Sequence, residues 1–203
     1  MKLIESKVEI IEQQPGLEGV YKQIELAGRT CYKSEDKITE DSAKEFVDRM
    51  IKSKHGAMLE HGTVYLKATA KYDIAQDYWD MPQKLFASFF NKNKYSKLRT
   101  VESEDACDCY ITTNMRVIVE NNLFECLKYI CEPTEHHEKR ITARFICDRG
   151  VSHEIVRHRA MSFAQESTRY CNYSKDKFGN ELTFIKPSWY SKTLENKHGG
   201  FER

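Results

Sequence analysis

The first third of the chain carries the apolar patterns of both kinds of regular structure. Residues Val8 to Ile11 form a short apolar-rich run, which predicts an edge strand. A helix from about Gly16 to Ala27 is predicted by apolar side chains that recur at helical spacing, namely Leu17, Val20, Tyr21 and Ile24.

A second helix and a strand follow. Ser42 and Glu45 have the spacing of a capping box, and Gly56 stands near the expected end of this helix. Its apolar face consists of Phe46, Val47, Met50 and Ile51. Alternating positions beyond Gly56 predict a half-buried strand, whose inward side chains are Val64, Leu66, Ala68 and Ala70.

The middle of the chain has a weaker pattern. Residues 72–110 mix aromatic side chains with Lys and Asn, and we expect an insertion, partly helical, that elaborates one edge of the fold. From Asn114 to about Cys131 the spacing predicts a helical pair, whose inward side chains are Val117, Val119, Leu123, Leu127 and Ile130.

A strand and a short helix come last. The strand ends near Gly150 and has two alternating faces, the first with Ile141, Ala143, Phe145 and Cys147 and the second with Thr142, Arg144 and Ile146. Ser152 can cap a short helix that delivers Arg157-His158-Arg159 at its C-terminal end, where cationic side chains are favourable. Because strands and helices do not alternate strictly, the pattern indicates an α+β fold.

The composition is that of one ordinary soluble domain. The 203 residues are 40% hydrophobic and 31% charged, and the formal net charge of +1 excludes a molecule that binds polyanions over its whole surface. Positive charge is local instead, because residues 139–170 contain seven Lys and Arg against three acidic side chains, a net of +4. Such a focused charge favours a small anionic ligand over a nucleic-acid track.

The seven cysteines are irregularly spaced, and no secretory leader precedes them. No apolar run approaches the roughly 20 residues of a membrane span. We therefore expect a cytoplasmic protein with reduced thiols and no membrane contact.

Residues 157–170 are the best candidate for a binding segment. They combine three arginines and a histidine with hydroxyl, amide and carboxylate side chains, which are costly to bury without partners. Such a set can line a pocket for a phosphorylated or carboxylated ligand. The alternative is a solvated surface patch.

Two other segments carry candidate chemistry. Residues His55 to His61 lie between a predicted helix and a strand, where functional side chains are often presented, although a helix stop with two incidental histidines is the alternative. Residues 135–138 contain two histidines and two glutamates, with Cys107, Cys109, Cys126 and Cys131 upstream. These spacings do not match a closed zinc site, so we expect no metal, but buried reduced cysteines and a solvated turn.

Several common catalytic motifs are absent from the sequence. There is no glycine-rich phosphate loop, no Walker lysine and no Ser-His-Asp elbow. An enzyme with this sequence would bind phosphates through side chains and would take its chemistry from a cofactor.

Three ordered blocks resemble one known family. Arg157-His158-Arg159, followed after seven residues by Ser167, is similar to the signature of the flavin-dependent thymidylate synthases, and residues 162–170 resemble its extension. His55 to His61 and the weaker block Ala27 to Tyr32 precede it in the family's order. The resemblance covers roughly residues 1–70 and 134–190, and leaves about 72–130 as an insertion in a single domain of residues 1–203.

The resemblance implies an antiparallel sheet flanked by helices and a specific reaction. Family members methylate dUMP to dTMP with 5,10-methylenetetrahydrofolate as carbon donor and reduced FAD, recharged by NADPH, as hydride source. They use no cysteine nucleophile and form homotetramers with flavin at subunit junctions. The resemblance thus implies a homo-oligomer that binds small molecules rather than nucleic acid.

The resemblance also implies roles for single residues. The catalytic set would be Arg157, His158, Arg159 and Ser167. The cofactor side would be formed by Cys31, His55, Ala57, Glu60, Arg157, His158, Arg159 and Gln165. The nucleotide would be held by Glu154, Arg157, Gln165, Glu166, Ser167, Thr168 and Arg169, with Arg169 on the phosphate.

The sequence departs from the family in two places, so other functions stay open. Ala164-Gln165 stands where many members have Asn-Glu, and Glu154 stands where many have glutamine. The chain also ends at residues 199–203 without the family's usual C-terminal helical segment, which implies a C-terminally short domain. The alternatives are therefore an inactive relative that binds nucleotide or FAD, and an RNA-binding module that stacks bases on Phe163, Tyr170 and Tyr173.

Overall fold

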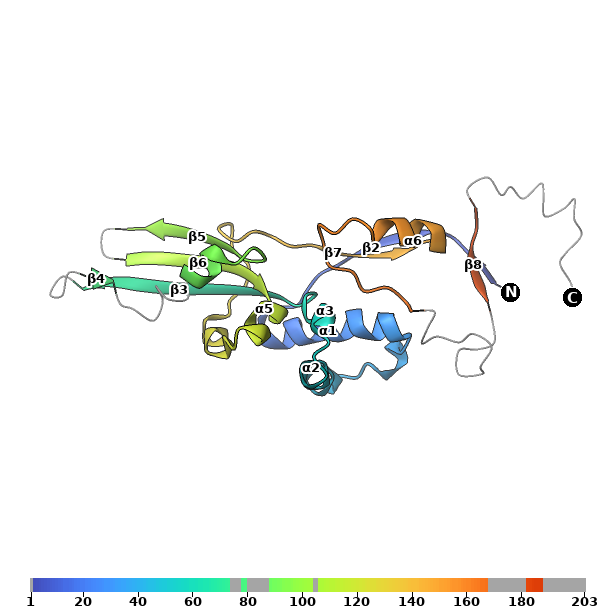
Figure 1. The fold of residues 1–203 in the computed structure, drawn as a ribbon, viewed down its shortest axis with the longest axis horizontal. Helices are drawn as coiled ribbons and strands as arrows, with labels where there is room; N and C mark the ends of the chain where they lie inside the picture. The colour runs from blue at the N-terminus through green and yellow to red at the C-terminus, as the bar shows by residue number, and fades with distance from the viewer. Residues whose placement is uncertain (1, 74–77, 80–87, 104–105, 168–181, 188–203) are drawn as a thin grey trace, which may run out of the picture.

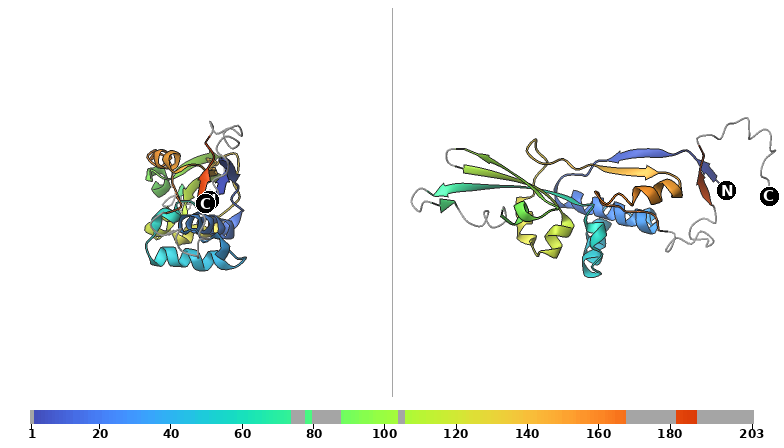
Figure 2. Two further views of the ribbon diagram at one scale, coloured as in Figure 1. Left: turned by 90° about the vertical axis from the view of Figure 1, so that its right-hand side faces the viewer. Right: turned by 45° about the horizontal axis from the view of Figure 1, so that its top comes forward.

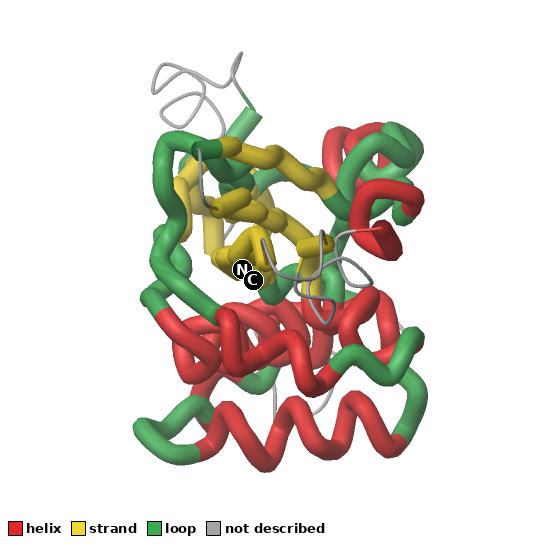
Figure 3. Tube along the Cα trace, turned by 90° about the vertical axis from the view of Figure 1, so that its left-hand side faces the viewer, coloured by secondary structure: helices red, strands yellow, loops and turns green. Residues whose placement is uncertain are grey.

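The computed structural model describes residues 2–73, 78–79, 88–103, 106–167 and 182–187. The described chain is elongated (Figure 1). A four-stranded sheet occupies one end, and a long helix runs from beneath it toward two smaller strand pairs at the other end. Figures 2 and 3 show that the main helices gather on one side of the strands. This arrangement confirms the α+β prediction of antiparallel sheets flanked by helices.

The main sheet is antiparallel, with strand order β4-β3-β6-β5. Its strands are β3 (Thr63–Asp73), β4 (Tyr78–Trp79), β5 (Lys97–Glu102) and β6 (Ala106–Asn114). The predicted strand is confirmed in β3, because its four expected inward side chains, Val64, Leu66, Ala68 and Ala70, are all buried.

The segment 72–110 was expected to elaborate one edge of the fold, but residues 97–114 contribute to the main sheet itself. They form β5 and β6, and β6 lies inside the sheet between β3 and β5. From Cys109 onward every side chain of β6 is buried, including Thr112 and Thr113. A strand that is buried on both faces has no alternating pattern, which explains why the sequence did not reveal it.

Helix α1 (Gly16–Tyr32) begins where the sequence predicted, but continues past Ala27 to Tyr32. Gly28 lies in this continuation, and a Cβ at that position would lie 2.4 Å from the Phe46 ring of helix α2 (Ser42–Lys52). The close contact between the two helices therefore requires glycine at position 28.

The predicted capping box of α2 is wrong. Asp41 occupies the N-cap position, and Ser42 is the first helical residue. The Ser42 hydroxyl donates to Glu25 Oε2 at 2.8 Å, and Glu25 also pairs with Arg29 at 3.0 Å. The hydroxyl therefore joins α2 to α1 instead of closing its own helix.

The predicted helical pair is confirmed by α5 (Met115–Glu120) and the 3₁₀ helix η2 (Phe124–Tyr129). Asn114 caps α5, because its side chain accepts a hydrogen bond from the Val117 amide at 3.0 Å. Both helices pack into the core together with α1, α2 and the short helix α3 (Gly56–Leu59). A further short 3₁₀ helix, η1 (Glu35–Lys37), links α1 to α2.

A second layer of strands completes the fold. The predicted edge strand is β2 (Lys7–Ile11), which pairs antiparallel with β7 (Thr142–Ile146). β1 (Lys2–Ile4) pairs in parallel with β8 (Thr183–Ile185). The two faces of β7 alternate as predicted, but Ala143 and Phe145 face solvent while Thr142, Arg144 and Ile146 are half-buried.

Helix α6 (Arg149–Ile155) follows β7. Its N-cap is Asp148, which accepts from the Val151 amide at 3.0 Å, so the prediction that Ser152 caps this helix is wrong. The helix does deliver residues 157–159 just beyond its C-terminal turn, as expected. None of the described helices is long and apolar enough to cross a membrane.

Candidate functional site

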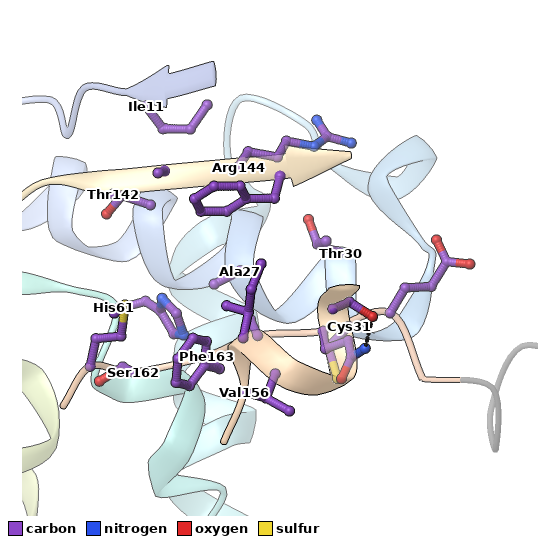
Figure 4. A pocket seen from close by; sticks show the side chains of 18 of the residues that line it. Ile11, Ala27, Thr30, Cys31, His61, Thr142, Arg144, Val156, Ser162 and Phe163 are labelled. Carbon is purple, nitrogen blue, oxygen red and sulfur yellow. Dashed lines mark hydrogen bonds between the residues drawn. The ribbon is translucent and has the colours of Figure 1, made fainter. Parts of the chain in front are cut away.

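A cavity of about 2060 Å³ lies between α1, β7 and residues 160–167 (Figure 4). Ala27, Thr30 and Cys31 line it from α1, and Thr142 and Arg144 line it from β7. Both faces of β7 border the cavity, because Ala143 and Phe145 of the exposed face line it together with Thr142, Arg144 and Ile146 of the half-buried face. A cavity of this size exceeds the 300–1,000 Å³ typical for one small ligand.

Hydrogen bonds hold residues 160–167 against the rest of the wall. Ser162 donates to Glu60 Oε2 at 2.6 Å, and Gln165 donates through Nε2 to the Ser152 hydroxyl at 2.7 Å. The Ser167 amide donates to the Cys31 carbonyl at 3.0 Å. This segment of irregular backbone is thus tied to α3, α6 and α1, although it contains no regular structure of its own.

Glu60 is held from both sides of its carboxylate. Arg116 Nη1 donates to Oε1 at 2.6 Å, while Ser162 bonds the other oxygen. The Nε atom of Arg116 also donates to Glu120 at 2.7 Å. The same atom would lie 2.9 Å from a Cβ atom at Gly56. Arg116 therefore connects α5 to the start and the end of α3.

Two buried polar atoms in the cavity wall have no hydrogen-bond partner among the described residues. They are Nε2 of His61 and Nε2 of Gln23, and Gln23 is only 4% exposed. Burial lowers the pKa of His61, so its ring is neutral at pH 7. Buried polar groups are nearly always satisfied, so these two atoms offer binding capacity to a ligand in the cavity.

The Arg157-His158-Arg159 cluster does not line this cavity. All three side chains are exposed, and Arg157 pairs with Glu154 at 2.8 Å on the outer side of α6. The structure therefore separates this cluster from Gln165, Glu166 and Ser167, which do line the cavity, although the sequence places them a few residues apart. Thr168 and Arg169, which were predicted to hold the nucleotide, lie outside the described residues.

The His55 segment is likewise divided. His55 and Ala57 are exposed and are not part of the cavity wall, whereas Glu60 is. The His55 ring lies parallel to that of Tyr32 and its Nδ1 is 3.0 Å from the Tyr32 hydroxyl. His55 is therefore held beside the C-terminal end of α1.

Cys31 and Glu166 occupy the same end of the cavity. Burial raises the pKa of the Cys31 thiol, which keeps it protonated at neutral pH. Glu166 pairs with Lys33 at 3.6 Å, and the six described cysteines are all free.

The segment around residues 135–138 is solvated only in part, since Glu135 and Glu138 are exposed as expected. His137 is buried, its Nδ1 accepts from the Thr134 amide at 3.0 Å, and its Nε2 donates to the Leu66 carbonyl at 3.1 Å. His137 thus fastens this turn to β3, which corrects the expectation of a solvated turn for this side chain. Within the described ranges, no three His, Cys, Asp or Glu side chains lie close enough to hold a metal ion.

Arg116 and Gln23 are the site residues that the sequence reasoning missed. Arg116 lies in the segment expected to be an insertion, and no motif marks it. Gln23 is a polar residue on the buried face of α1. Its sequence context does not indicate that it is buried, and only the packing of α1 shows this.

Comparison with known proteins identified one family. The model of the family described as "thymidylate synthase complementing protein" matches residues 77–201, which is more than half of the chain. The match includes the Arg157 to Ser167 motif and most of the segment 72–130. No curated protein and no solved structure matched the chain.

Proposed function

This chain belongs to the flavin-dependent thymidylate synthase family, and we propose that it converts dUMP to dTMP. In this proposal 5,10-methylenetetrahydrofolate supplies the carbon, and reduced FAD, recharged by NADPH, supplies the hydride. The observation that carries the proposal is the cavity that residues 160–167 of the family motif line on one side. Its volume suits more than one ligand at a time, as a reaction between a nucleotide, a flavin and a folate requires.

Part of the candidate set suits a bound flavin and nucleotide, because Cys31, Glu60, Gln165, Glu166 and Ser167 line one cavity. The unpartnered Nε2 atoms of His61 and Gln23 are available as hydrogen-bonding groups in the wall, and the exposed guanidinium groups of Arg157 and Arg159 suit phosphates. FAD would be held by Cys31, His55, Ala57, Glu60, Gln165 and the Arg157 to Arg159 cluster. The nucleotide would be held by Glu154, Arg157, Gln165, Glu166, Ser167, Thr168 and Arg169.

The flavin supplies the electrons when it is bound, and the residues of the chain orient the ligands. The Gln165 side chain is oriented because its Nε2 donates to Ser152, which leaves Oε1 as an acceptor for a uracil N–H. The Glu60 carboxylate is fixed by Arg116 and Ser162. Cys31 keeps its proton because burial raises its pKa, so it is a poor nucleophile, in keeping with chemistry that needs no enzyme thiolate.

The exposed apolar face of the β2–β7 ribbon supports the proposal of a homo-oligomer. Val8 lies opposite Phe145 and Ile10 opposite Ala143, and with Ile141 the large side chains of this face are 51–68% exposed. A two-stranded ribbon is marginal by itself, and a contiguous apolar patch marks an interaction surface. Ile141, Ala143 and Phe145 of this face also border the cavity, so a second copy of the chain on this face would lie beside the site.

The test is turnover by the purified chain with FAD, NADPH, 5,10-methylenetetrahydrofolate and dUMP. Formation of dTMP that requires all four components, together with a flavin band that survives desalting, is the expected result. Retention of FAD and dUMP without dTMP would instead identify a binding relative. Failure to retain FAD and dUMP under conditions where the chain is folded would refute the proposal.

A further inference from the structure

Residues 160–167 line one end of the cavity, here called the motif end. The other end, here called the sheet end, reaches the main sheet and is lined by a different set of charged side chains. Lys94, Lys97 and Arg140 line this second end, next to Tyr95 and Asn114. Lys97 is the first residue of β5 and Lys94 precedes it by three residues, while Arg140 lies two residues before β7. Segments far apart in the sequence thus bring three cations to one end of the cavity.

Arg140 is held in place by neutral groups rather than by an acid. Its Nη1 donates to the Thr113 carbonyl at 3.1 Å and its Nη2 to the Tyr95 carbonyl at 2.7 Å, while its amide donates to the Tyr65 hydroxyl at 3.1 Å. The side chain is half-buried, and burial lowers its pKa, but a guanidinium stays charged at neutral pH. These bonds fix the guanidinium without neutralising it.

The two lysines complete the cluster. The Lys94 ammonium lies 4.7 Å from the centroid of the Tyr95 ring, and Lys97 is paired across the sheet with Thr112, next to the Thr113 carbonyl that holds Arg140. In the part of the chain that the structure describes, no carboxylate lies within ion-pair distance of Lys94, Lys97 or Arg140. Glu138 lines the same end and favours the charged form of Arg140, so three cations face one acid.

The motif end of the cavity differs in this respect. There, Lys33 pairs with Glu166 at 3.6 Å and Arg144 pairs with Glu35 at 3.8 Å. Lys33 and Arg144 are thus paired with acids, whereas at the sheet end the described residues offer three cations a single nearby acid, Glu138, and no ion pair. A desolvated guanidinium beside two lysines is most readily neutralised by an anionic group of a ligand.

The two ends are close enough for one extended ligand to reach both. Glu60 bonds Ser162 at the motif end, and Thr63, three residues later, pairs with Asn114 beside the Arg140 site. Three residues span at most about 10 Å, and neighbouring strands are about 5 Å apart. A folate whose pterin lies at the motif end can therefore extend its glutamate end toward the lysines.

We propose that Lys94, Lys97 and Arg140 form an anion subsite that binds the γ-linked glutamate carboxylates of the folate. This inference rests on the proposed function. Several separate cations along one wall suit a chain of carboxylates, which can pair with them in succession. The 2′-phosphate of NADPH has the same chemistry and is the second source that the experiment distinguishes.

The experiment compares tetrahydrofolate carrying one glutamate with tetrahydrofolate carrying three, by titration of the FAD-loaded chain. The test variant is Lys94→Ala/Lys97→Ala, and the matched control is Lys92→Ala/Lys139→Ala, whose lysines are exposed nearby but do not line the cavity. We expect the triglutamate to bind about tenfold more tightly than the monoglutamate in the wild-type and control chains, because each partly exposed pair changes affinity about threefold. In the test variant this advantage should fall below about twofold, with monoglutamate and FAD binding unchanged, and it should shrink with added salt.

The other outcomes are also decisive. An equal triglutamate advantage in the test variant and the control would overturn the glutamate subsite. If the test variant instead loses only its preference for NADPH over NADH, the anion subsite stands with the phosphate as its ligand. Should the wild-type chain bind neither FAD nor folate, the proposed function fails by itself. Titration with tripolyphosphate then tests the subsite directly, and equal affinity in both variants would refute it.

Discussion

Arg116→Met is predicted to weaken FAD binding by releasing Glu60. In the wild-type chain Arg116 Nη1 lies 2.6 Å from Glu60 Oε1, and the Glu60 carboxylate in turn receives the hydroxyl of Ser162. Methionine keeps an aliphatic stem over Gly56 but removes both donated hydrogen bonds. Glu60 then loses the partner that fixes its carboxylate at the cavity wall.

The magnitude follows from the distances and the exposure of the pair. A hydrogen bond to a charged group contributes about 1.5–3 kcal/mol, whereas an exposed ion pair contributes about 0.2–1 kcal/mol. The Arg116 side chain is 40% exposed and that of Glu60 28%, so solvent screening reduces the contribution toward about 1 kcal/mol. A loss of about 1 kcal/mol corresponds to an increase of about fivefold in the dissociation constant of FAD.

The assay is a titration of flavin fluorescence with the wild-type chain, Arg116→Met, Arg116→Lys and Arg49→Met. Arg49 pairs with Glu45 on α2, away from the cavity, and so controls for the loss of a surface arginine. Arg116→Lys should recover part of the affinity, because an ammonium can reach Glu60 or Glu120 but cannot bridge both. If Arg116→Met binds FAD as tightly as Arg49→Met, the inference that Arg116 positions Glu60 is refuted.

Three further predictions concern stability, pH and assembly. Glu25→Gln should lower the unfolding free energy by about 3 kcal/mol in urea, because it leaves Arg29 without the buried carboxylate, which is 1% exposed; a change below about 1 kcal/mol would contradict a stabilising role for this pair. Burial lowers the folded-state pKa of His61, so its neutral form stabilises the fold above the unfolded pKa of about 6.5, and this contribution is lost as the pH falls toward the folded pKa. The urea midpoint should therefore fall between pH 7 and 5, and should fall less in His61→Gln; equal slopes would contradict this. Phe145→Asp should reduce the mass found by analytical ultracentrifugation, since it places a charge on the exposed β2–β7 face, whereas Lys7→Asp, on the opposite face of β2, should not; unchanged mass in both would remove this face from the interface.

Only part of the candidate site could be predicted from the sequence. The resemblance named Glu60, Gln165, Glu166 and Ser167, and these residues do line one cavity. It also named Arg157 to Arg159, which the fold leaves outside that cavity on the exposed side beyond α6. Residues adjacent in a motif follow one another along the chain, but the direction in which each side chain points depends on the elements packed around it.

Residues without a motif were missed because their partners are distant in sequence. Arg116 becomes part of the site only when α5 packs beside α3, 56 residues from Glu60 along the chain. Ser42 resembled a helix cap, but a buried carboxylate on α1 offered its hydroxyl a stronger partner than its own helix did. In both cases a long-range contact decided the role of the side chain.

The sequence by itself determined the local elements whose apolar faces repeat with a clear period. It determined the start of α1, the inward face of β3, the helical pair after Asn114 and the family motif, because periodicity and motif spacing are properties of neighbouring residues. Only the tertiary structure decided that β6 lies inside the sheet, that both faces of β7 border the cavity, and that Lys94, Lys97 and Arg140 meet at one end of it. Those outcomes depend on which surfaces pack together, and this is settled by burial and pairing across the whole chain rather than by any local pattern.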